Sequence, residues 1–180
     1  TETFVRRELS GLAEIGFHPV AHSIWKGKDQ WNGNKINRFR LSSLWTLFFW
    51  IPYWAFRKPR AFVEVLGVLW SRSCPNLQNW NETFLGLGFA LVRANSFRMQ
   101  GFSLIHGIWA TMPATAALAI SKLTGIPFSM GAHAYDVFRH GGDWLLPLKL
   151  EEASFVRTSS VSSAKRLKAM KVPPERIKLI

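Results

Sequence analysis

The chain has 180 residues, of which 48% are hydrophobic, and it carries a formal net charge of +12. This length and apolar content predict one domain with a sizeable core and exclude an intrinsically disordered chain. The only cysteine, Cys74, excludes an internal disulfide. Because the net charge is strongly positive, nucleic acids and anionic membranes are both possible classes of partner.

The first predicted element is a helix that begins at Thr1 or Thr3 and ends at Gly16. Threonine is a favoured N-terminal cap, and glycine commonly terminates helices. The chain starts without methionine, directly at this helix, and it stops within the apolar run 177–180, which indicates the opening of a strand. We therefore expect the sequence to be a fragment of a longer protein.

A basic, aromatic and helical insertion is predicted at about 36–72. Between Lys26 and Arg72 there are nine Lys or Arg residues, two acidic residues and five of the nine tryptophans. Within this stretch residues 41–56 carry no charge. A membrane-spanning helix needs about 20 apolar residues, so this run, which also contains Pro52, is short for a span. The residues expected to contact a membrane are Trp45, Trp50, Trp54, Arg57, Lys58 and Arg60.

Three interpretations of the uncharged run remain open. The first is docking in a membrane interface, because aromatic rings settle at the headgroup level and flanking cations attract anionic lipids at about 1 kcal/mol each. The second is ordinary helix packing in the core, and the third is a true span. Binding of nucleic acid is not expected, because the aromatic residues form one apolar block instead of alternating with charge, and no nucleic-acid-binding motif accompanies them.

From residue 103 onward, strand-like and helix-like segments alternate. Strands are predicted at 103–109, 126–132, 155–159 and from 177, and helices at 113–124, 145–153 and 162–170. This alternation predicts an α/β fold with a Rossmann-like parallel sheet and helices on both faces. We expect the strands that end at Ile108, Ala132 and Ser159 to be neighbours in that sheet.

His133 and Asp136 follow the predicted strand at 126–132 and lie in a predicted loop. Ligands of open parallel sheets bind beyond the carboxyl ends of the strands, so these two residues are candidates for a hydrogen-bonding pair that faces a ligand. The alternative is a satisfied, buried polar pair. His106 ends the preceding strand, and a role in the same crevice and a structural role are both open.

Two other kinds of site are not indicated by the sequence. His18, His22 and His140 show no metal-ligand spacing with cysteine or carboxylate groups, so no metal site is predicted. The Gly86-Leu87-Gly88 run lacks both the third glycine and the preceding strand of a dinucleotide-binding fingerprint.

Several motifs together resemble family 4 glycosyltransferases of the GT-B fold, especially members that act in colanic-acid and exopolysaccharide biosynthesis. Residues 1–9 resemble the family's S-E-T-F-I and R-E-L helix, and 105–110 resemble I-H-A-H-F-A. Residues 125–138 resemble G-I-P-F-S-F-T-A-H-A-x-D-I-F, and 153–160 resemble A-x-F-V-V-T-x-S. The resemblance covers both ends of the chain and most of its second half, and it is weak from Lys26 to Arg98.

The resemblance implies roles for individual residues. His133 would be catalytic, facing the donor sugar, and Asp136 would orient the loop. The other residues implied to bind substrate are His106, Glu2, Thr158 and Ser160. The family often has a second histidine where this chain has Ile108. Structural alternatives stay open, because hydroxyls after a strand commonly cap the next helix and an acid in a first helical turn favours the helix dipole.

The function implied by the resemblance is that of the N-terminal, acceptor-side domain of a retaining glycosyltransferase. The donor would be a nucleotide sugar, no cofactor or metal is implied, and the acceptor would be a lipid-linked or glycan substrate. A missing C-terminal domain would hold most of the nucleotide, so we expect this domain alone not to turn over. The expected location is cytoplasmic, peripheral at the inner face of the plasma membrane, where an anionic surface is the partner.

Two alternatives from other classes remain. One is a non-catalytic module that binds membrane surfaces on a Rossmann-like scaffold, and the other is a different α/β enzyme, since this fold carries many functions.

Overall fold

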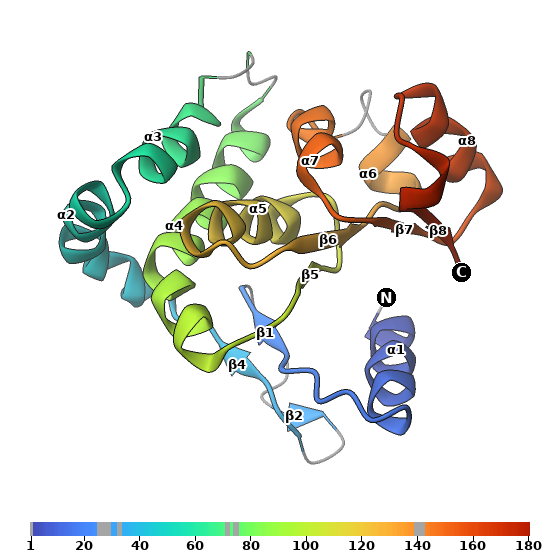
Figure 1. Cartoon of the computed structure of the whole chain (residues 1–180), viewed down its shortest axis with the longest axis horizontal. Helices are drawn as coiled ribbons and strands as arrows, with labels where there is room; N and C mark the ends of the chain where they lie inside the picture. The colour runs from blue at the N-terminus through green and yellow to red at the C-terminus, as the bar shows by residue number, and fades with distance from the viewer. Residues whose placement is uncertain (1, 25–29, 32–33, 71–72, 74–75, 139–142) are drawn as a thin grey trace. The chain divides into compact units, whose positions relative to one another are not determined.

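The structure, a computed structural model, describes residues 2–180 except 25–29, 32–33, 71–72, 74–75 and 139–142 (Figure 1). The side chains at 2–4, 31, 34 and 134 are also outside the described part. Predictions that concern Cys74 and His140 therefore fall outside the described residues. The chain divides into two compact units, 1–43 and 44–180, and each is described by itself.

The first unit holds one helix and short strands. Helix α1 spans Glu2–Glu14, and Gly16 follows its last turn with a φ of 86° in the left-handed region, so the predicted helix and its stop are confirmed. Strand β1 (His22–Ser23) pairs in parallel with β4 (Asn37–Arg38). Strands β2 (Gln30–Trp31) and β3 (Asn34–Lys35) form an antiparallel pair.

The second unit is organised by a four-stranded parallel sheet. Its strands are β5 (Ile105–Gly107), β6 (Phe128–Gly131), β7 (Val156–Thr158) and β8 (Ile177–Leu179), in the order β5-β6-β7-β8. His106 pairs with Ser129, Gly131 with Arg157, and Thr158 with Leu179. The predicted α/β class, the parallel sheet and the adjacency of the first three strands are confirmed.

The helices between these strands follow the sequence signals closely. Helix α5 spans Met112–Thr124, with Pro113 in its first turn and Gly125 ending it at a φ of 82°. Helices α7 (Leu146–Glu152) and α8 (Val161–Ala169) begin within one residue of their predicted starts, and the short 3-10 helix η3 spans Pro174–Arg176. The predicted loop after β6 is wrong, because residues Ala134–Phe138 form the short helix α6.

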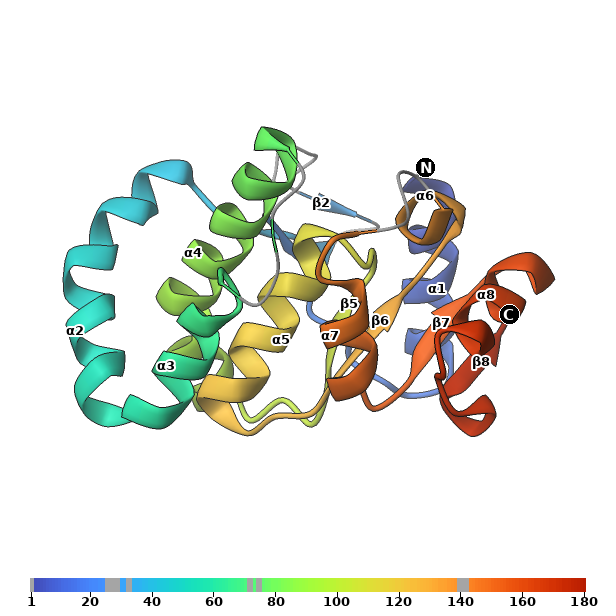
Figure 2. The ribbon, with the colours of Figure 1, turned by 90° about the horizontal axis from the view of Figure 1, so that it is seen from above.

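The aromatic segment and the residues that follow it form three short helices, and the part from Leu44 onward belongs to the unit of the sheet. A 3-10 helix, η1 (Leu41–Thr46), leads into α2 (Leu47–Arg57), and α3 (Pro59–Gly67) follows. The long helix α4 (Leu77–Gln100) lies beside α5 (Figure 2). Among the described residues, no helix has the length and apolar character needed to cross a membrane.

Two glycines in α4 have a packing role. A Cβ at Gly86 would lie 2.9 Å from the Met112 carbonyl oxygen and 3.2 Å from the Thr115 Cβ, and one at Gly88 would lie 2.6 Å from Leu44 Cδ2. These distances are too short for a side chain. The two glycines therefore let α4 approach α5 and the segment before α2, which agrees with the rejection of a nucleotide-binding glycine motif.

We predict that Gly86→Val destabilises the protein by about 2 kcal/mol, because overpacking against backbone cannot be relieved by a rotamer change. Gly67→Val is the matched control, since a Cβ at Gly67 meets nothing within 4 Å. Urea unfolding measures both free energies. Equal stability of the two variants would contradict the packing role of Gly86.

Candidate functional site

The carboxyl ends of β5, β6 and β7 bring together residues that are distant in the sequence. Side chains alternate between the two faces of a strand, so His106, Ser129 and Arg157 share one face of the sheet. Gly107 lies on the opposite face, where a Cβ would be 2.8 Å from the Ala114 Cα of α5. The face of His106 is therefore turned away from α5, and it carries polar groups.

His106 is held within this polar face. Its Nδ1 lies 2.8 Å from Ser129 Oγ, and its ring stacks on Phe155 with 6.3 Å between the centroids. Nε2 is buried without a hydrogen-bond partner among the described residues. Burial, with the charges of Arg157 and His133, lowers the pKa of His106 to about 4. His106 is therefore neutral at physiological pH.

His133 lies after β6, directly before the first residue of α6. Its Nδ1 lies 3.3 Å from Ser159 Oγ, and its ring meets Trp109 edge-on with 5.4 Å between the centroids. Burial and the nearby Arg157 lower the pKa of His133, which favours a neutral ring with one donor and one acceptor. A Cβ at Gly131 would lie 3.0 Å from His133 Nε2, so the glycine leaves room for this ring.

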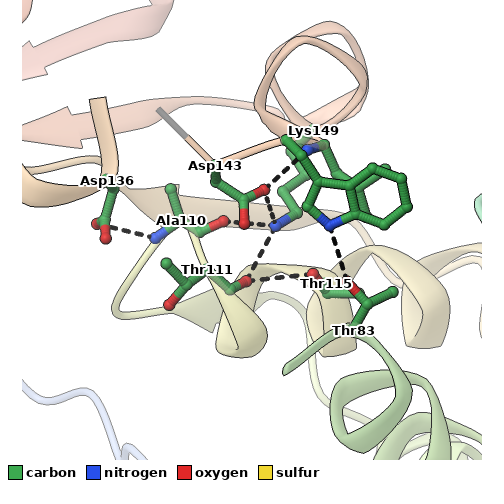
Figure 3. Close-up of polar contacts among 9 residues, drawn as sticks. Thr83, Ala110, Thr111, Thr115, Asp136, Asp143 and Lys149 are labelled. Carbon is green, nitrogen blue, oxygen red and sulfur yellow. Dashed lines mark hydrogen bonds and ion pairs between the residues drawn. The ribbon is translucent and has the colours of Figure 1, made fainter. Parts of the chain in front are cut away.

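Asp136 links the loops that follow β5 and β6. Its Oδ2 accepts a hydrogen bond from the backbone N–H of Ala110 at 3.1 Å (Figure 3). It also accepts from the backbone N–H of His133 at 3.4 Å. The carboxyl group is buried, and burial is the largest cause of a raised pKa. The prediction that Asp136 faces a ligand is corrected, because its carboxylate accepts from backbone groups inside the protein. It orients the loop and caps α6, which explains why the predicted loop is helical.

Lys149 is a buried residue of α7 that the sequence analysis missed. Its Nζ donates to the carbonyls of Ala110 (2.6 Å) and Thr111 (3.0 Å) and forms an ion pair with Asp143 (2.6 Å). Burial lowers the pKa of Lys149, and the Asp143 carboxylate acts in the opposite direction. A lysine in an amphipathic helix is ordinarily a surface residue, so no local signal identifies it.

The hydroxyl side chains at the end of β7 have different surroundings from those that the sequence predicts. Thr158 is fully buried, so its predicted contact with substrate is corrected. Ser160 Oγ accepts from the backbone N–H of Ser163 at 3.1 Å and caps α8, the structural alternative for this residue. Ser159, which was not predicted, carries the exposed hydroxyl beside His133. Glu2 begins α1, but its side chain lies outside the described part.

The three tryptophans predicted to contact lipid also differ from one another. Trp54 is 1% exposed, and its Nε1 donates to the Leu91 carbonyl of α4 at 2.8 Å. Its predicted lipid contact is corrected, because it belongs to the core. Trp50 is half-buried and stacks on Trp54, whereas Trp45 is 75% exposed.

Comparison of the chain with protein-family models, with curated protein sequences and with solved structures finds no match. In the part of the chain that the structure describes, no group of three or more His, Cys, Asp or Glu residues is arranged to hold a metal ion.

The arrangement favours a ligand rich in hydroxyl or anionic oxygen. His133 and Ser159 offer hydrogen-bonding groups at the sheet's carboxyl edge, and Trp109 adds an apolar ring next to them. Arg157 supplies a permanent positive charge close enough to lower the pKa of both histidines. Neutral imidazoles beside a guanidinium group are suited to orienting a polar ligand by hydrogen bonds.

We predict that Lys149→Met lowers the free energy of unfolding by about 3–5 kcal/mol, because it leaves the Asp143 carboxylate and two carbonyls buried without their partner. Lys122→Met is the matched control, since Lys122 pairs with the partly exposed Glu64 and Glu152 and its loss should cost less than about 1 kcal/mol. Chemical denaturation measures both. Similar losses in the two variants would contradict the central role of Lys149.

A second prediction concerns pH. The folded-state pKa of His106, about 4, lies below its ordinary value of 6.5, so the unfolded chain binds a proton that the folded chain does not. The free energy of unfolding should therefore fall as pH drops from 6.5 toward 4, by up to about 3 kcal/mol from this residue. His106→Gln should flatten this slope, because glutamine does not titrate in this range. An unchanged slope in His106→Gln would contradict the assignment.

Proposed function

We propose that this chain is the acceptor-side domain of a retaining GT-B glycosyltransferase, which uses a nucleotide-sugar donor and a lipid-linked or glycan acceptor. The confirmed parallel sheet is compatible with half of a GT-B fold. The resemblance of residues 105–110 and 125–138 to glycosyltransferase motifs supports glycosyl transfer as the class of reaction. A second, nucleotide-binding domain would hold most of the donor, so the proposal concerns the complete protein.

The observation that carries the proposal is the setting of His133 beyond the carboxyl end of β6. Open α/β sheets bind ligands at this edge. In glycosyl transfer the bond from the anomeric carbon to the leaving phosphate breaks while a bond to the acceptor oxygen forms, and the sugar gains oxocarbenium character. The acceptor hydroxyl gives its proton to the departing phosphate oxygen, so the step needs no further reactant. A neutral His133, oriented by Ser159 and by the α6 cap, would donate a hydrogen bond to the donor sugar.

Other residues have supporting roles in this proposal. Arg157 would favour binding of an anionic donor or acceptor, and Trp109 would exclude water beside the His133 ring. His106 lies deeper along the same face and would hold Ser129 and the sheet surface in place. Glu2 remains a proposed acceptor contact on the basis of the resemblance alone.

The proposed location is the cytoplasmic face of the plasma membrane, where a lipid-linked acceptor is reached peripherally. The exposed aromatic side chains of η1 and α2 support this location. The same observation favours a second candidate function, a non-catalytic membrane-surface module. The two candidates differ in one respect, because only the enzyme requires the chemistry of His133.

We predict that His133→Ala, in the complete two-domain protein, lowers kcat by about 10²–10³ while the folded state persists, since positioned electrostatic donors are worth this much in rate. Sugar transfer from a panel of nucleotide sugars to membrane extract measures turnover, and thermal unfolding of the same preparations measures stability. His18→Ala, an exposed histidine in the first unit, is the matched control.

Turnover near that of the wild type in a folded His133→Ala protein would remove His133 from the mechanism. A lower melting temperature with unchanged activity per folded molecule would assign it a structural role instead. No transfer from any donor by the wild-type protein would favour the non-catalytic module.

A further inference from the structure

Helix α2 is apolar on two opposite sides. Its inner side carries Leu47, Trp50 and Trp54, spaced three and four residues apart as on one helical face. Trp54 attaches this side to α4 through the bond from its Nε1 to the Leu91 carbonyl. Tyr53 adds a hydrogen bond from its hydroxyl to Asn95 Oδ1 of α4 at 3.5 Å. Neither of these two hydrogen bonds to α4 involves Phe48, Phe49 or Phe56.

The outer side of α2, with the last turn of η1, carries four exposed aromatic residues. We call Trp45, Phe48, Phe49 and Phe56 the aromatic face. Phe48 is 80% exposed and Phe56 is 89% exposed, and Trp45 stacks on Phe48 with 6.2 Å between the centroids. A helix that is hydrophobic all round normally lies inside a protein or in a membrane. Among the described residues of this unit, none covers these side chains.

Positive charge adjoins the aromatic face. Arg57, Lys58 and Arg60 are all exposed where α2 meets α3, directly after Phe56, and we call them the basic turn. The sequence has no acidic residue between Asp29 and Glu64, and Glu64 is itself paired with Lys122. Figures 1 and 2 both place α2 and α3 at the end of this unit that is remote from β7 and β8. The stretch that forms this surface is therefore apolar and cationic and contains no acidic residue.

We propose that the aromatic face and the basic turn bind the interface of an anionic lipid bilayer, with α2 lying along the membrane plane. Exposed phenylalanine and tryptophan rings enter the boundary between headgroups and acyl chains, while adjacent arginine and lysine side chains bind lipid phosphates. The buried Trp54 does not touch lipid, but it fixes the outward direction of Phe48 and Phe56 by holding the opposite side of the helix on α4.

A lipid surface fits these residues better than a second copy of the chain does. A two-fold dimer over the aromatic face would also bring two copies of the basic turn to one interface, where like charges repel. The inference rests on the proposed function only for the choice of the cytoplasmic leaflet. Binding itself involves neither His133 nor any sugar, so the two proposals fail separately.

The test is co-sedimentation of the full chain with phosphatidylcholine vesicles prepared with and without phosphatidylglycerol. We expect binding to the anionic vesicles that weakens as salt screens the charges. The double variant Phe48→Ser/Phe49→Ser should weaken binding about tenfold or more, because two large apolar groups are lost from the interface. The triple variant Arg57→Gln/Lys58→Gln/Arg60→Gln should weaken it on the order of a hundredfold on anionic vesicles only.

The matched control is Leu77→Ser/Met99→Ser, which removes two equally exposed apolar side chains from α4. This control and His133→Ala should bind vesicles as the wild type does. Equal binding to neutral and anionic vesicles, or equal loss in the control and in Phe48→Ser/Phe49→Ser, would overturn the proposal. A concentration-dependent doubling of mass by light scattering that Phe48→Ser/Phe49→Ser abolishes would assign the aromatic face to a second copy.

Discussion

Both hydrogen-bonding groups of Ala110 are held by buried charged side chains, and the candidate site depends on this constraint. Asp136 accepts from the Ala110 N–H, and Lys149 donates to the Ala110 carbonyl. Figure 3 shows the two side chains approaching the peptide from α6 and α7. The loop between β5 and α5 is thereby fixed to the loop after β6. Because Asp136 also accepts from the His133 N–H, directly before α6, the same contacts orient the imidazole toward Trp109 and Ser159.

The electrostatics of the sheet face follow from this packing. Burial alone would favour neutral histidines, and the Arg157 charge acts in the same direction on His106 and His133. The carboxyl edge therefore combines one permanent cation with two neutral rings that can donate or accept. Such an edge can orient a hydroxyl-rich or anionic ligand without a change in its own protonation. Because the pKa values of both histidines are lowered, these residues near the candidate site contribute to a loss of folding stability at acidic pH.

Helix α2 shows how one helix serves two environments. The Trp54 side belongs to the core through α4, and the opposite side presents phenylalanine rings outward. A rigid attachment on one side gives the other side a defined direction, which a flexible apolar loop would lack. The candidate site and the proposed lipid-binding surface thus lie at different elements of the same unit, at the start of α6 and on α2, and each is supported by its own buried polar contact.

Local signals in the sequence were sufficient for the strands of the parallel sheet and for α5, α7 and α8, but not for α6. Pro113 and Gly125 bound α5, and short apolar runs mark β5, β6 and β7, because capping and strand patterns depend on residues close in the chain. The setting of Lys149, 39 positions from Ala110, has no such local signal. Trp54 and Phe48 also have similar sequence surroundings, since both lie in the uncharged run 41–56, and yet Trp54 is buried and Phe48 is exposed. These outcomes depend on which side of a helix meets a distant neighbour, so only the tertiary structure decided them.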